Sequence, residues 1–522
     1  MFCIEKAMST CAFNWGRSFE MIFLEMWDFD FLPENQDSNK LIGGRIIYNR
    51  NNNIADLFKK YHGIHTSNFQ TSDITIFSKT LKKQLSNEKP ILLTCDQSFL
   101  PWINENKKYG IERYSGALFL YDYNKSLDTF TCMDLHNDLE SLSLPFSDLL
   151  NSVRYKELYD FVSFTLIGEF KEYFELSIII NSLIKSISSK KATCLNSFEA
   201  MNNFTDSIFD INLSLEVPDQ NSWYWTPLCF SLRNVTRSRN LLALTFNYLY
   251  DKLAITDFNE VSRYFLQSGS EWNSMLSLIS KAVYTSRWNN DIKGKVVSMV
   301  LDAKKIEEKI YNIVSNINPL YPNSLCRPTM IPNTQKDITK EFNYLDIQTH
   351  CNNKAIITDI TDINSIDLDE LKSGFLLNKI PDKYKICGDG FSFKLALGDN
   401  LRYDNISCQG QEINILSIIA NEIFFLCCSE WGDYFDKVVI EYSDGKVEEL
   451  FLQFYDWSCN SPSSGWSIAI EGEAIDTRNI NSRGFPVYLF YKKFILINNK
   501  STVKRVILPH CINAHIFSIT LI

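Results

Sequence analysis

Hydrophobic residues change their spacing twice along the chain and divide it into three regions. From about residue 150 to 318, apolar residues recur at intervals of three and four, as they do on one face of a helix. The segments with this spacing are 155–183, 237–253, 261–265, 272–282 and 296–314. The stripe in the last segment consists of Met299, Ala303, Ile306, Ile310 and Ile313. We therefore predict a helical domain over residues 146–318, with its apolar stripes packed between helices.

Beyond about residue 385, short apolar runs alternate with turn residues, which is typical of β-strands. The runs are KVVIEY (437–442), VEELFLQF (447–454), SIAIEG (467–472), VYLFYKKFILI (487–497) and VKRVILP (503–509). The pair Asp444-Gly445 between the first two runs is a hairpin signal. Strands at this spacing predict an antiparallel β-sandwich over residues 385–522.

The passage between these two regions is rich in proline and asparagine. The stretch NPLYPNSLCRPTMIPN (318–333) contains four prolines and predicts a linker. We assign residues 319–384 as a linker and connecting segment. Its Asp-rich part, 334–384, is either the first strands of the sandwich or an extended connector.

The first 145 residues mix one clear helix with several short strands. The helix is expected from Cys3 to about Trp15, with Gly16 as its stop. The chain as a whole is therefore expected to be an α+β multidomain protein, with a mixed N-terminal domain, an α-helical middle and a C-terminal antiparallel β-sandwich.

Composition excludes several classes of protein. The 522 residues carry a net charge of −10 and no dense basic stripe, which argues against a nucleic-acid partner. Acidic residues interrupt the first thirty positions, and no apolar run is long enough to span a membrane, so neither a secretory signal nor a membrane partner is expected. The 14 cysteines and 6 histidines lack paired metal-binding spacings. We expect reduced thiols, no metal, no cofactor and a cytoplasmic location.

Cys3 is the residue with the clearest chemical potential. A cysteine at the start of a helix has a lowered thiol pKa, because the first-turn N–H groups and the helix dipole stabilise the thiolate. Papain-like enzymes prepare their nucleophile in this way. From spacing alone, the competing interpretation is a small buried residue near a chain end.

An ordered set of short motifs resembles the amino-terminal domain of the butirosin-biosynthesis protein H family. The motifs are Cys3-x3-Ala7-x8-Gly16 with FE (19–20), WDFDF (27–31) and IGGR (42–45), then FKKYHGI (58–64), KPILLTCDQSFLPW (89–102), GALFLYDYN (116–124) and FTCMDLHND (130–138). The resemblance implies a papain-like cysteine fold over residues 1–145, related to the peptidases that trim bacteriocin leaders. It also implies an acyltransferase that moves an acyl chain from a carrier-protein thioester to an amine.

The resemblance assigns roles to individual residues. Cys3 matches the nucleophile, Asp134 matches the acid after the last strand, and Asp96 matches the acid in the loop after the fourth motif. The family places a histidine just before strand 116–121, where this chain has Tyr114. A tyrosine does not replace imidazole as a base near neutral pH, because its pKa is normally about 10.

Three explanations of this departure are open. In the first, the imidazole comes from His136, which lies two residues beyond Asp134, or from His62 or His65. In the second, the domain uses Cys3 without a full triad. In the third explanation, the domain has lost its chemistry and only binds an acyl or peptidyl chain.

The C-terminal region resembles galactose-binding-like, carbohydrate-associated β-sandwiches. The matching stretches are EYSDGKVEELFLQFYDW (441–457) and VILPHCINAHIFSITL (506–521). Such a module implies a sugar stacked on an exposed Trp457 or Trp466, with Asp456 beside it. The competing interpretation is that Trp457 packs in the sandwich core. No pair of acidic residues stands at strand ends as glycoside hydrolysis requires, so we do not expect a glycosidase.

These observations predict an accessory protein of nonribosomal peptide or polyketide biosynthesis. It would transfer or release an acyl or peptidyl chain from a carrier-protein thioester through Cys3, with a small-molecule amine as acceptor. The alternative is a non-catalytic binding or scaffold protein with a degenerate cysteine-protease fold and a sandwich that binds a sugar or peptide. A third class, a cysteine peptidase acting on a leader peptide, requires an extended groove beside Cys3.

Overall fold

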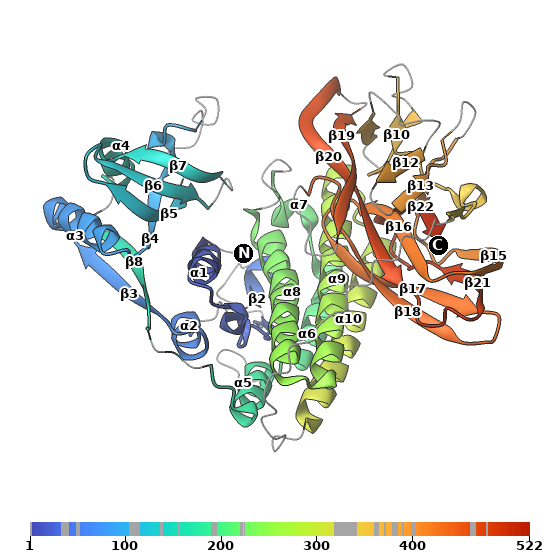
Figure 1. Ribbon diagram of the computed structural model, residues 1–522, viewed down its shortest axis with the longest axis horizontal. Helices are drawn as coiled ribbons and strands as arrows, with labels where there is room; N and C mark the ends of the chain where they lie inside the picture. The colour runs from blue at the N-terminus through green and yellow to red at the C-terminus, as the bar shows by residue number, and fades with distance from the viewer. Residues whose placement is uncertain are drawn as a thin grey trace.

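The structure is a computed structural model in three parts (Figure 1). An N-terminal sheet with helices is followed by a bundle of long helices and then by a large β region. The structure describes residues 3–32, 41–48, 53–103, 115–135, 139–154, 157–168, 170, 172–188, 196–219, 223, 225–317, 342–359, 365–369, 372–377, 385–388, 391–397, 402–459, 466–476 and 479–522. Within these residues, no helix combines the length and the hydrophobicity needed to cross a bilayer.

The N-terminal part is built on a six-stranded antiparallel sheet of order β3-β8-β4-β5-β6-β7. Its strands are β3 (Ile64–Thr71), β4 (Ile91–Asp96), β5 (Ser115–Asn124), β6 (Thr129–Asp134), β7 (Leu139–Pro145) and β8 (Tyr159–Leu166). Its helices are α1 (Cys3–Asn14), α2 (Ile54–His62), α3 (Ile74–Ser86) and α4 (Phe146–Val153). A small pair, β1 (Asp30–Phe31) and β2 (Ile46–Ile47), precedes α2.

Alternation along the strands gives the sheet two apolar faces. Leu92 and Phe119 pack in one core with α1 and α2, whereas their neighbours Leu93 and Leu118 pack in another with α3 and α4. The predicted first helix is confirmed, and Gly16 follows it with a positive φ of 62°. The papain-like assignment itself stays a prediction.

The helix predicted over 155–183 is wrong in its first half. Residues Tyr159–Leu166 form β8, which pairs with β3 along its whole length, and only α5 (Leu176–Ser188) is helical. The sequence YDFVSFTL is rich in aromatic and β-branched residues, and Phe161 and Phe164 enter the cores on opposite faces of the sheet. The N-terminal sheet therefore extends past the boundary expected at residue 145.

The helical middle agrees with the predicted stripes. Its elements are α6 (Ser197–Ser207), α7 (Leu213–Glu216), α8 (Pro227–Leu253), α9 (Thr256–Thr285) and α10 (Asn290–Asn316). The two segments expected at 261–265 and 272–282 are one continuous helix, α9. Helices α8, α9 and α10 pack side by side between the two sheet-containing parts (Figure 1).

A fully buried ion pair joins the helices of this bundle. Arg239 on α8 donates from Nε and Nη2 to the two carboxylate oxygens of Glu307 on α10, each at 2.9 Å. The carboxylate also accepts from Trp27 Nε1 at 2.9 Å and from Ser268 Oγ on α9 at 2.7 Å. Arg239 Nη1 donates to the carbonyl oxygen of Asp28 at 2.9 Å. Burial opposes ionisation of Glu307, but Arg239 and these hydrogen bonds bring its pKa below the usual value.

The C-terminal part consists of two packed antiparallel sheets that share one apolar core. The larger sheet contains β9 (Asn343–Tyr344), β10 (Ile356–Ile357), β11 (Ser373–Leu376), β14 (Ile406–Ser407), β16 (Glu422–Ser429), β19 (Ser467–Asp476), β20 (Asn479–Ile495) and β22 (Ala514–Leu521). The smaller contains β15 (Glu412–Ile419), β17 (Tyr434–Tyr442), β18 (Val447–Phe454) and β21 (Thr502–Ile507), and β12 (Lys385–Gly388) pairs with β13 (Phe391–Lys394). One pair in the larger sheet, β10 with β11, is parallel.

Two expectations about this region can be compared with the structure. The predicted hairpin is confirmed, because Asp444 and Gly445 lie in the turn between β17 and β18. Of the two alternatives for 334–384, the structure favours opening strands, since β9 and β11 pair with β22 and β19. The larger sheet thus begins before residue 385.

Helix α9 joins the bundle to the sandwich through buried polar groups. Lys281 Nζ donates to Glu430 Oε1 at 2.8 Å and to Asn513 Oδ1 at 2.9 Å. One turn earlier, Ser277 Oγ and the Tyr434 hydroxyl are 2.6 Å apart. These contacts fix the position of the β region against the bundle.

We predict that Glu307→Gln destabilises the protein strongly, because it leaves the Arg239 charge buried without its counter-ion. Removing one partner of a buried pair typically costs about 3–5 kcal/mol of unfolding free energy. Urea denaturation followed by tryptophan fluorescence measures the loss. The double variant Arg239→Met/Glu307→Leu should recover most of it.

Lys305→Ala is the matched control, because Lys305 lies on the same helix and pairs with Asp302 at the surface. We expect no measurable change in the denaturation midpoint for this variant. Equal effects of Glu307→Gln and Lys305→Ala would contradict the role of the buried pair.

Candidate functional site

The first turn of α1 is held between the sheet and the helical bundle. Lys6 Nζ donates to the carbonyl oxygen of Leu135, at the end of β6, at 3.1 Å. Glu5 on the neighbouring side of the helix is buried and pairs with Arg237 of α8, with 2.7 Å between Oε2 and Nη2. Cys3, the first residue of α1, thus lies one turn before a lysine that contacts the residue after Asp134.

Asp134 is fully buried at the end of β6 and accepts two side-chain hydrogen bonds. Gln97 Nε2 donates to Oδ1 and Trp102 Nε1 donates to Oδ2, both at 2.9 Å. The amide of Gln97 lies so close to Gly116 that a Cβ at that position would be 2.2 Å from the amide carbon. Among the described residues, Gln97 Oε1 has no hydrogen-bond partner.

Asp96 lies at the end of β4, next to Gln97, but its carboxylate serves the backbone. It caps the short 3-10 turn Gln97–Phe99, accepting from Ser98 N at 3.0 Å and from Ser98 Oγ at 2.7 Å. Gln97 therefore connects the two predicted acids: it follows Asp96 and donates to Asp134. The sequence pattern does not single out Gln97 or Trp102, although both lie in the motif KPILLTCDQSFLPW that contains Asp96.

His62 has a structural role that excludes it as the missing base. Its Nε2 accepts from Met21 N at 3.2 Å, so in the neutral ring Nδ1 carries the hydrogen and faces Ser18 Oγ at 3.2 Å. Burial lowers the pKa of His62 to about 3. Ser18 in turn donates to Glu172, which also accepts from Tyr248 of α8. This network holds α2 against the bundle.

His65 is exposed on the edge strand β3. Three strands separate β3 from β6 in the sheet, which at the usual strand spacing corresponds to roughly 19 Å. His65 is therefore remote from Asp134. The other predicted members, His136 and Tyr114, lie outside the described residues.

A groove with a volume of about 520 Å³ runs beside α1. Its walls come from α1, from the segment after it, and from β5, β6 and β7. The lining residues are Ser9, Thr10, Phe13, Asn14, Phe19, Tyr121, Met133 and Ser141. Phe13 is 84% exposed, which is unusual for an aromatic side chain on a packed helix.

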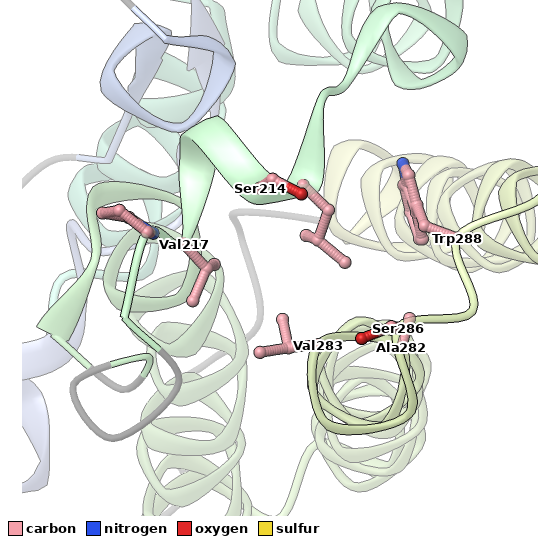
Figure 2. A pocket seen from close by; sticks show the side chains of 8 residues that line it. Ser214, Val217, Ala282, Val283, Ser286 and Trp288 are labelled. Atoms are coloured by element: carbon pink, nitrogen blue, oxygen red, sulfur yellow. The ribbon is translucent and has the colours of Figure 1, made fainter.

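A second hollow, of about 340 Å³, lies between α7 and the end of α9 (Figure 2). Val217, Val283 and Trp288 supply its apolar walls, and the exposed Ser214 and Ser286 stand at its rim. Trp288 Nε1 donates a hydrogen bond to the carbonyl oxygen of Ile211 at 2.9 Å. Its lining in the described part of the chain contains no titratable side chain, so this hollow is suited to binding rather than to acid–base chemistry.

The expected sugar site in the sandwich is not supported. Trp457 is only 5% exposed and packs edge-on against Phe375, with 5.3 Å between ring centroids, so the core interpretation is correct. Trp466 is buried as well. Asp456 accepts from Gly432 N at 2.7 Å and from Ser458 N at 2.9 Å, as a turn residue does.

Comparison of the chain with models of known protein families and with curated protein sequences finds no match. Across the described residues, no group of three or more histidine, cysteine, aspartate or glutamate side chains is arranged to hold a metal ion. The assignment of a site therefore depends on the geometry around α1 and β6.

Glu271 on α9 has a strongly perturbed pKa where the helical bundle meets the sandwich. Burial, and then the like charges of Asp436 and Asp302, raise its pKa to about 7. Asp436 on β17 also has a raised pKa, chiefly through burial. Perturbed carboxyl groups often mark active sites, but here burial between packed elements is the main cause of the shift and the nearby acids add to it.

We predict that Glu271→Gln stabilises the protein in a pH-dependent manner. The folded-state pKa of about 7 lies above the ordinary value of 4.5, so the unfolded chain releases the proton first and the wild-type protein loses stability as the pH rises between these values. The variant should match the wild type near the lower value and exceed it by on the order of 1–2 kcal/mol at pH 8. Thermal denaturation at a series of pH values measures this, and a pH-independent difference would contradict it.

Proposed function

We propose that this chain is a cytoplasmic accessory protein of natural-product biosynthesis. It transfers or releases an acyl chain from a carrier-protein thioester through a covalent intermediate on Cys3. The N-terminal domain carries the chemistry in this proposal, and a small-molecule amine or water is the acceptor. The helical middle and the sandwich support that domain and offer surfaces for the carrier protein.

The observation that carries the proposal is the position of Cys3 at the start of α1, one turn before Lys6, which contacts the residue after Asp134. The free N–H groups of a first helical turn favour a thiolate over a thiol. Lys6, one turn later, brings a positive charge to the same end of the helix and contacts Leu135. A cysteine prepared in this way is a nucleophile near neutral pH without a base to remove its proton.

The proposed reaction has two steps. In the first, the Cys3 sulfur forms a bond to the thioester carbonyl carbon, the bond from that carbon to the pantetheine sulfur breaks, and the released thiolate takes a proton from solvent. In the second, an amine or water attacks the acyl-enzyme, the carbon–sulfur bond to Cys3 breaks, and the attacking group gives its proton to solvent. The first step resembles thiol exchange and depends mainly on the thiolate.

The arrangement of Asp134 favours a second candidate function, a binding protein without catalysis. Both oxygens of Asp134 accept hydrogen bonds from Gln97 and Trp102, as in a purely structural acid. Covalent labelling separates the two functions.

We predict that wild-type protein incubated with an acyl-pantetheine thioester gains the mass of one acyl group, and that Cys3→Ala does not. Intact-mass spectrometry with peptide mapping measures the adduct. Cys11→Ala is the matched control, because Cys11 lies on the same helix but is buried, and burial raises its thiol pKa well above the ordinary value. Absence of an adduct on wild type across several thioesters would refute the covalent proposal.

A further inference from the structure

The groove beside α1 lies along the helical face to which position 3 belongs. Positions 3, 10 and 14 are separated by seven and four residues and thus fall on one helical face. Thr10 and Asn14 line the groove, and they lie about 10 Å and 17 Å along the helix axis from the position of Cys3. A chain attached at the start of α1 and extended along this face therefore enters the groove.

Strand β6 borders the groove on its other side. Leu135, which contacts Lys6 in the first turn of α1, is two residues from Met133, which lines the groove. The groove therefore lies next to the junction between α1 and β6, where we place the active site. Tyr121 of β5 lies beyond Met133 and extends the same wall.

Most hydrogen-bond donors in the groove are already committed. Ser9 Oγ and Thr10 Oγ1 each donate to the carbonyl oxygen of Lys6 at 2.9 Å, inside the helix. The Tyr121 hydroxyl donates to Ser141 Oγ at 3.4 Å. Of the polar groups in the described lining, Asn14 and Ser141 are exposed at the rim. A peptide main chain needs partners for each N–H and C=O, whereas an alkyl chain needs none.

Apolar side chains supply the rest of the lining. Phe13, Phe19, Tyr121 and Met133 offer rings and a thioether, and methionine adapts its shape to an apolar guest. The large exposed area of Phe13 would be covered by a chain lying in the groove. This lining suits a flexible hydrocarbon better than a polar or charged group.

We infer that the groove along α1 binds the acyl chain of the substrate, and that this chain is a medium-length aliphatic acyl group rather than a peptide. The inference rests on the proposed function for the position of the thioester at Cys3. It adds a substrate class to that function and excludes the leader-peptide reading of the site.

The first experiment measures binding without chemistry. Decanoyl-pantetheine and acetyl-pantetheine are prepared as non-cleavable amides and titrated calorimetrically into the full chain. We expect the decanoyl amide to bind at least about ten-fold more tightly, because burial of two methylene groups already supplies such a factor. Met133→Trp, which fills the groove from β6, and Ser9→Trp, which fills it from α1, should each remove the preference.

Lys79→Trp is the matched control, since Lys79 is exposed on α3, on the opposite face of the sheet. It should retain the preference for the decanoyl amide. Circular dichroism spectra of all three tryptophan variants establish that they are folded. With two filling positions on different elements, misfolding of one variant does not prevent the test.

The second experiment separates this inference from the proposed function. The decanoyl and acetyl thioesters are compared as donors for adduct formation on wild type and on Ser9→Trp. A decanoyl-amide preference that groove filling abolishes, without any adduct, refutes the covalent function and supports the groove. Adducts formed equally well from both donors, with no effect of groove filling, support the function and overturn the inference. Tighter binding of a peptidyl amide of equal length than of the decanoyl amide also overturns it.

Discussion

The buried pair of Arg239 and Glu307 is the interaction on which the arrangement of the chain depends. Two charges far from solvent are tolerated only when each is fully paired, and here the pairing draws on four separate segments: α8, α9, α10 and the stretch that contains Trp27 and Asp28. A helix shifted by one turn would leave a charge without its partner. The pair therefore selects one packing of the bundle, whereas apolar stripes alone permit several.

This selection reaches the proposed active site through α8. Arg237 lies two residues before Arg239 and faces away from the bundle core, towards Glu5 in the first turn of α1. With Arg239 fixed by Glu307, the position of Arg237 is also fixed, and α1 is held with its start beside the end of β6. The helix that presents Cys3 is thus oriented by a charge pair in another part of the molecule.

The features that could be predicted from the sequence are those that depend on residues close together along the chain. The stripes of α8, α9 and α10 and the turn at Asp444-Gly445 need only local periodicity, and all are found. The pattern of β8 predicts a helix because its aromatic residues fit both helical and strand spacing, and only pairing with β3 decides between the two. The contact of Gln97 and Trp102 with Asp134 was also out of reach, since it requires β4, β5 and β6 to be paired in register first.

The same reasoning explains why we place the proposed acyl-binding site along α1 and not in the second hollow. A covalent intermediate fixes one end of the chain, so its binding groove must begin within reach of the nucleophile and follow the same helical face. The groove lined by Thr10 and Met133 meets that condition, because the contact between Lys6 and Leu135 aligns α1 with β6. The hollow beside Trp288 lies between α7 and the end of α9, and none of its described lining residues belongs to α1 or β6. The proposed chemistry at Cys3 and the shape of the groove along α1 therefore both depend on the placement of one helix.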